Sequence, residues 1–142
     1  MAGILLVDDN PNIRHLLRVY VETQTHFRIC GEAGHGVDAI EKARDLQPDL
    51  VLLDLSMPVL GGAEAASVLK RMLPQTKIVL FSMHFNEIPK ALASAIGIDL
   101  TLSKSDGITK LGEHLKSLLA PQGVDDLANL QAGSKAISSP PV

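Results

Sequence analysis

Five polar residues, each a type that takes part in phosphoryl chemistry, stand directly after or at the end of apolar stretches of the chain. They are, in chain order, Asp8, Asp9, Asp54, Ser82 and Lys104. Carboxylates that converge repel one another, and a divalent cation with hard oxygen ligands relieves that repulsion, which favours Mg²⁺, with Mn²⁺ as the alternative. A hydroxyl and an ammonium suit the oxygens of a phosphoryl group. The set therefore predicts in-line transfer of a phosphoryl group to Asp54, giving an acyl phosphate.

Each of these residues alone has an ordinary structural explanation. A lone aspartate after a strand is commonly a turn or helix-cap residue, and a lone lysine is usually a solvated charge. The combination favours chemistry, because an acid pair, an acid, a hydroxyl and a lysine follow four different predicted strands in that order.

The elements that must position these residues are indicated by apolar periodicity. Runs of strand length alternate with segments of helical period, which is typical of βαβ units around a parallel sheet. The predicted strands are 3–7, 28–33, 50–54, 78–82 and 100–103. The predicted helices are 13–21, 37–46, 66–73, 87–96 and 108–118, of which the fourth is weakly amphipathic and is expected to pack less firmly. In such a sheet the carboxyl ends of the strands form the binding edge, where the five residues meet.

Composition narrows the class of protein. The chain has 142 residues, 46% of them hydrophobic and 20% charged, as expected for a soluble protein with one core. A net charge of -3 and scattered basic residues argue against nucleic acid as a direct partner of this chain. No leader or bilayer-spanning run is evident, so we expect a cytoplasmic protein without membrane contact. The single Cys30 has no disulfide partner and is expected to be a small core residue.

Four segments together resemble the receiver (REC) domain of bacterial two-component response regulators. They are V-D-D-N, L-L-D-L-S-M-P-V-L-G-G, V-L-F-S-M-H and L-S-K-S. The resemblance covers about residues 2–119. It implies a flavodoxin-like, doubly wound (βα)5 fold with a five-stranded parallel sheet in the order 2-1-3-4-5. We expect a receiver domain over 1–120. Residues 121–142, rich in Pro, Gly, Ser and Ala, are expected to be a flexible tail or linker, with an optional short helix around 124–130.

The resemblance also implies a role for each site residue. Asp54 is the phosphoacceptor, Asp9 a direct metal ligand, and Asp8 an acid that acts largely through metal-bound water. Ser56 supplies a backbone carbonyl to the metal, and Ser82 and Lys104 bind the phosphoryl group. The backbone amides of Leu55, Ser56 and Met83 are expected to face the phosphoryl oxygens. Pro58 and Gly62 match the family's loop after the phosphoacceptor.

Two positions depart from the family's pattern. Thr101 stands where the family usually has an aromatic residue that swings inward when the switch hydroxyl moves. We favour an altered switch there over transfer of the aromatic's role to Phe81 or Phe85. Met83 follows Ser82 where Ala or Gly is frequent. One hypothesis is that Met83, with Ser56 and His84, tunes access of water to the acyl phosphate; the alternative is that Met83 only packs against the fourth helix.

The leading function is therefore a phosphorylation-controlled signalling switch whose donor is a sensor histidine kinase or a phosphotransfer protein. Its output surface is expected to be formed by the fourth helix, the strand 100–103 and the last helix, and that surface acts on a partner, an output domain or a second copy of the chain. The 22 residues after Ala120 are too few for an output domain, so the chain is either a stand-alone receiver or part of a longer regulator. Less favoured are an aspartate-nucleophile phosphohydrolase and an interaction module that works without phosphorylation. A dinucleotide-binding domain lacks its glycine fingerprint.

Overall fold

The computed structural model describes residues 2–55, 57, 60–82, 89–104 and 110–120 of the chain. Five strands and five helices alternate within this part. The strands are β1 (Gly3–Val7), β2 (Arg28–Ala33), β3 (Leu50–Leu53), β4 (Lys77–Ser82) and β5 (Leu100–Ser103). The helices are α1 (Pro11–Gln24), α2 (Gly36–Leu46), α3 (Gly62–Met72), α4 (Lys90–Ile96) and α5 (Leu111–Leu118).

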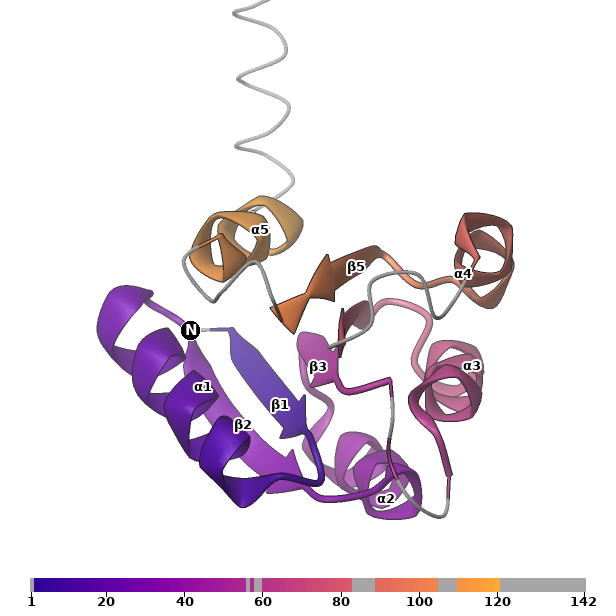
Figure 1. The fold of residues 1–142 in the computed structure, drawn as a ribbon, viewed down its shortest axis with the longest axis horizontal. Coiled ribbons are helices and arrows are strands. Elements are labelled where there is room, and N and C mark those ends of the chain that lie inside the picture. The colour runs from indigo at the N-terminus through magenta and orange to yellow at the C-terminus, as the bar shows by residue number, and fades with distance from the viewer. Residues whose placement is uncertain (1, 56, 58–59, 83–88, 105–109, 121–142) are drawn as a thin grey trace, which may run out of the picture.

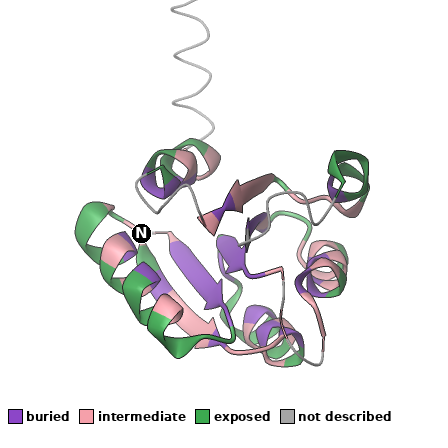
Figure 2. Cartoon of the chain, in the orientation of Figure 1, coloured by how far each residue is buried: buried purple, intermediate pink, exposed green. Residues whose placement is uncertain are grey.

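The strands form one parallel sheet in the order β2-β1-β3-β4-β5, which confirms the predicted topology. Helices α1 and α5 cover one face, and α2, α3 and α4 cover the other (Figure 1). Because successive strand residues point to opposite faces, Ile4 and Leu6 pack with α1 and α5, while Leu5 and Val7 pack with α2 and α3. The central strands are buried on both sides (Figure 2), as the continuous apolar runs of the sequence required.

Several boundaries differ from the predictions. The third strand ends at Leu53 rather than Asp54, although the Asp54 N–H still donates to the Val7 carbonyl at 2.8 Å. Helix α3 begins four residues earlier than predicted, at Gly62, because its first turn consists of one glycine, two alanines and Glu64 and so shows no apolar period. Helix α4 begins at Lys90 rather than at 87, which lies outside the described residues, and α5 begins at Leu111 rather than at 108, also outside them.

The least firmly packed helix is α4, as predicted. Of its seven residues only Ala93 is buried, whereas α3 buries four and α5 three. Cys30 is half-buried against the core, and burial raises the pKa of its thiol despite the opposing Arg28 charge. Within the described ranges, no helix is both long and apolar enough to cross a membrane.

Candidate functional site

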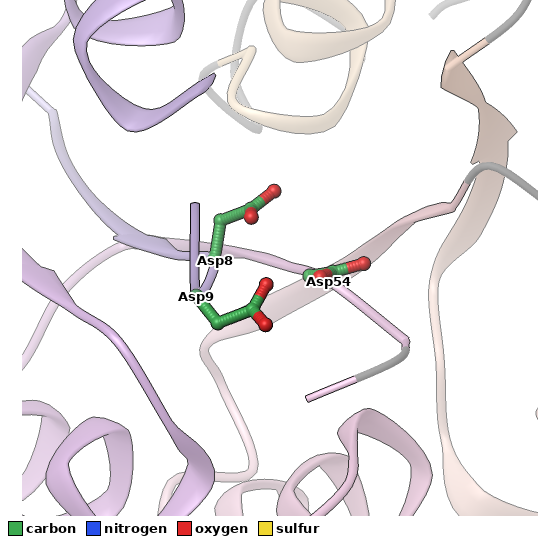
Figure 3. A group of neighbouring side chains, drawn as sticks. All are labelled: Asp8, Asp9 and Asp54. Carbon is green, nitrogen blue, oxygen red and sulfur yellow. The ribbon is translucent and has the colours of Figure 1, made fainter. Parts of the chain in front are cut away.

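Three carboxylates meet where β1 and β3 end (Figure 3). Asp8 and Asp9 directly follow β1, and Asp54 directly follows its neighbour β3. Each of the three offers an oxygen, and these oxygens all lie within 4.8 Å of one another. Asp8 and Asp54 are buried, at 3% and 7% exposure, whereas Asp9 is exposed. The predicted acidic cluster is therefore present, and Asp9 opens it to solvent.

An ammonium group lies against this cluster. Lys104, the residue after β5, donates from Nζ to Asp8 Oδ2 at 2.7 Å and lies 3.3 Å from Asp54 Oδ1. The same Nζ stands 5.9 Å from the centre of the Phe81 ring, within the range of a cation–π contact. Sequence analysis placed Lys104 at this edge but missed its direct pairing with Asp8.

The chemistry of the donor set fits a divalent cation. Three carboxylates and one ammonium leave a formal charge of minus two on a half-enclosed cluster of oxygens. Hard oxygen ligands with an open, solvent-facing side suit Mg²⁺, which retains several waters when protein carboxylates bind it. Asp8, Asp9 and Asp54 would hold the ion.

The turn after β1 is fixed by hydrogen bonds to the local backbone. Asp8 Oδ1 accepts from the Asn10 N–H at 2.9 Å, and Asn10 Oδ1 caps α1 by accepting from the N–H groups of Asn12 and Ile13. Pro11 occupies the first helical position, where its missing N–H costs nothing. The chain therefore passes from strand to helix directly behind the acid pair.

A network of charged side chains behind the turn was missed by sequence analysis. Arg14 donates from Nη1 to the Asp8 carbonyl at 2.6 Å and from Nε to Glu32 Oε1 at 3.0 Å. Arg18 donates to Glu32 Oε2 at 2.7 Å. Burial opposes ionisation of Glu32, but hydrogen bonds from Arg18 and Arg14 outweigh it and lower the pKa of the carboxyl. The sequence pattern that could have indicated this network is a pair of arginines one helical turn apart together with a glutamate inside a predicted strand.

The start of α3 packs directly on the backbone of Asp54 and Leu55. The Gly62 N–H donates to the Leu55 carbonyl at 2.9 Å. A Cβ atom on Gly62 would lie 2.4 Å from the Asp54 carbonyl oxygen and 2.6 Å from Leu55 Cα. Only glycine fits this close approach, so the backbone of Asp54 and Leu55 is held against the start of α3.

The other predicted site residues are placed only in part. Ser82 ends β4 and pairs in register with Ser103, the residue before Lys104. Leu55 follows Asp54 and packs against the core. Ser56, Met83 and His84 lie outside the described residues, as do Pro58, Phe85 and residues 121–142, so the access-tuning hypothesis and the tail stay predictions.

The position of Thr101 bears on the predicted switch. Thr101 pairs with Leu80 in the sheet and, with residues of α3 and α4, lines a hollow of about 640 Å³. Phe81 is buried at 4% exposure among residues that pack with α1 and α5, on the other face of the sheet. The two side chains therefore face different layers of the fold.

Comparisons with a family model and with curated proteins agree on one family. Residues 4–116 match the family model described as response regulator receiver domain. The chain is 36% identical over 115 residues to the response regulator protein VraR of Staphylococcus saprophyticus, an alignment that covers 80% of this chain and 54% of VraR. The chain thus spans about half the length of the curated relatives it matches.

Solved structures agree with the sequence matches. The response regulator TrrA of Thermotoga maritima, solved in complex with Mg²⁺ and BeF, superposes with a TM-score of 0.76 at 33% identity, covering 84% of this chain and all of TrrA, 100%. A LuxR-family two-component response regulator from Aurantimonas superposes with a TM-score of 0.79 at 27% identity, covering 93% of this chain and 99% of that one. With the sheet order and the acidic edge described above, these matches show that the chain belongs to the response regulator receiver domain family.

Proposed function

We propose that this chain is the phosphorylation-controlled switch of a two-component system, in which Asp54 accepts a phosphoryl group from a histidine kinase or a phosphotransfer protein. The observation that carries the proposal is the meeting of three carboxylates and one ammonium at a single edge of the sheet. Family membership supports the role of a signalling switch rather than of an enzyme with an external substrate.

In the proposed reaction an Asp54 carboxylate oxygen attacks phosphorus. The bond from phosphorus to the donor's leaving atom breaks as the new phosphorus–oxygen bond forms. Bound Mg²⁺ would supply neutralisation of the charge on the phosphoryl oxygens. Lys104, 3.3 Å from Asp54, is within reach of those oxygens and would exchange its bond to Asp8 for one to the phosphoryl group. A positioned ammonium in a half-buried site stabilises developing negative charge far better than one in water.

The remaining assignments rest on the family resemblance and on chain order. Ser82 would donate a hydrogen bond to the phosphoryl group, and the backbone amides of Leu55, Ser56 and Met83 would face its oxygens. The backbone carbonyl of Ser56 would complete the metal ligands. Ser82 lies beside Ser103 in the sheet, which places it one residue from Lys104 in the neighbouring strand.

The proposed output surface is formed by α4, β5 and α5. Lys104 directly follows β5, so movement of its ammonium toward a phosphoryl group acts on the end of that strand. Helix α4 buries one residue, so it gives up the least buried contact of the elements of this surface when it moves. With Thr101 beside the hollow, we propose an altered switch that does not depend on an inward-turning aromatic at this position.

The test is the mass of the intact protein after incubation with acetyl phosphate and Mg²⁺. We expect one added phosphoryl group in the wild type, and none in Asp54→Asn or when the metal is chelated. Asparagine keeps the shape of the side chain but cannot act as the nucleophile. An equal gain in Asp54→Asn, or no gain in the wild type after rapid quenching, would contradict the proposal. Release of phosphate from a phosphomonoester in excess over protein would favour a phosphohydrolase instead.

A further inference from the structure

The backbone of Asp8 is held from the edge strand and from the first helix at once, by its N–H and by its carbonyl. The Asp8 N–H donates to the Ala33 carbonyl of β2 at 3.1 Å, and the Asp8 carbonyl accepts from Arg14 Nη1 at 2.6 Å. The carbonyl oxygen of Asp8 belongs to the peptide plane that carries Asp9. Its orientation therefore fixes the position of the Asp9 Cα atom and limits the directions in which the exposed Asp9 carboxylate can point.

Arg14 is itself held in one orientation. Its Nε donates to Glu32 Oε1, and Arg18 holds the other oxygen of the same carboxylate. The side chains of Arg14 and Glu32 are 21% and 29% exposed, so the pair is partly shielded from water. Lys42 also donates to the Glu32 backbone carbonyl, which ties α2 to the same residue. A guanidinium clamped at Nε presents Nη1 to the Asp8 carbonyl in a fixed direction.

We propose that Arg14 is a positioning residue for the acid pair: anchored by Glu32, it fixes the Asp8–Asp9 peptide so that Asp9 joins Asp8 and Asp54 around a divalent cation. This inference rests on the proposed function. Arg14 acts through the backbone, since within the described residues its bonds go to the Asp8 carbonyl and to Glu32 rather than to the three carboxylates. It is thus a counterpart of the outer groups that orient ligands in other metal sites.

Positioning and simple electrostatics predict opposite changes in cation affinity for the variant Arg14→Met. Removing a positive charge beside an anionic site favours cation binding, so a purely electrostatic role predicts tighter binding in Arg14→Met. Loss of positioning predicts weaker binding in the same variant. Arg18→Met is the matched control, because it removes the same charge from the same glutamate one helical turn farther along α1, where Arg18 pairs with Glu22.

The experiment is a titration of Mn²⁺, followed by electron paramagnetic resonance, and of Mg²⁺, followed by calorimetry, on wild type, Arg14→Met and Arg18→Met. We expect affinity to fall about tenfold in Arg14→Met. In Arg18→Met we expect it to stay within about twofold of the wild type. Unchanged or tighter binding by Arg14→Met, or equal weakening in both variants, would overturn the proposal.

Arg14→Lys provides a second test that keeps the charge and the fold. A lysine reaches one of the two acceptors at a time, so we expect affinity between that of wild type and Arg14→Met, and full wild-type affinity would count against positioning.

Urea unfolding of every variant separates metal affinity from stability. If the wild type binds neither ion and is not phosphorylated, the proposed function itself fails; if the wild type binds and Arg14→Met binds equally well, only the positioning role fails.

Discussion

Substitution of Gly62 by alanine tests how tightly Asp54 is held. Among the described glycines, Gly97 is the one with a positive φ, so Gly62 is required for space rather than for backbone conformation. The added Cβ would lie 2.4 Å from the Asp54 carbonyl oxygen, about 1 Å closer than an ordinary carbon–oxygen contact. The neighbouring atoms are backbone, so Asp54 and Leu55 must move away from α3.

The expected cost follows from this overlap. Overpacking of this kind costs about 1–3 kcal/mol, so Gly62→Ala should remain folded in a domain stabilised by roughly 5–15 kcal/mol. Displacement of the attacking carboxylate by about 1 Å should slow phosphorylation by about a hundredfold. The variant should therefore be folded, less stable and poorly phosphorylated.

The assay combines initial rates of phosphorylation by acetyl phosphate with urea unfolding followed by circular dichroism. Gly34→Ala is the matched control, because its Cβ would meet only Arg14 Nη1 at 3.6 Å, an ordinary contact. The control should keep wild-type rate and stability. If Gly62→Ala phosphorylates as fast as Gly34→Ala, the reasoning that α3 fixes the position of Asp54 is wrong.

Two further predictions concern charged groups at and beside the site. Lys104→Met should slow phosphorylation by about 10²–10³-fold, because it removes the ammonium that we propose binds the phosphoryl oxygens. The variant should bind Mn²⁺ at least as tightly as wild type, because Asp8 and Asp54 lose a competing cation. Weaker Mn²⁺ binding in a paramagnetic resonance titration would refute this account. Because the pKa of Glu32 is lowered from 4.5, its ion pairs stabilise the fold above that pH, and this contribution is lost as pH falls through the lowered pKa. The difference in unfolding free energy between wild type and Glu32→Gln should therefore be largest near neutral pH and shrink in acid. A difference in urea midpoint that is constant from pH 7 to about pH 3 would contradict the lowered pKa of Glu32.

The features predicted well from sequence are those that follow from apolar runs. Buried parallel strands need continuous apolar residues, so β1 has the predicted bounds and the acids after β1 and β3 meet as expected. The edge strands β2 and β5 also have the predicted bounds, although most of their residues are only partly buried. Alternation of strands and helices alone does not fix which strands are neighbours. The sheet order came from the family resemblance, and the structure confirms it.

The features missed depend on contacts between distant segments. The first turn of α3 begins at Gly62, which is there for close packing, and its other residues, two alanines and Glu64, form no amphipathic stripe. The bonds of Arg14 to Glu32 and to the Asp8 carbonyl require the register between α1 and β2, which no local pattern contains. Lys104 lies 96 positions from Asp8, so their pairing emerges only when β5 is placed in the sheet.

The small number of buried residues in α4 affects how the native protein opens locally. Buried Ala93 contributes on the order of 1 kcal/mol of apolar burial and Ile96 packs on the core only in part, whereas several large, fully buried side chains hold β1 and β3. Opening of α4 alone therefore requires much less free energy than unfolding the whole domain. We therefore expect the amide hydrogens of α4 to exchange with solvent through local opening and those of β1 and β3 to exchange mainly through global unfolding, so that α4 behaves as a separate cooperative unit of low stability.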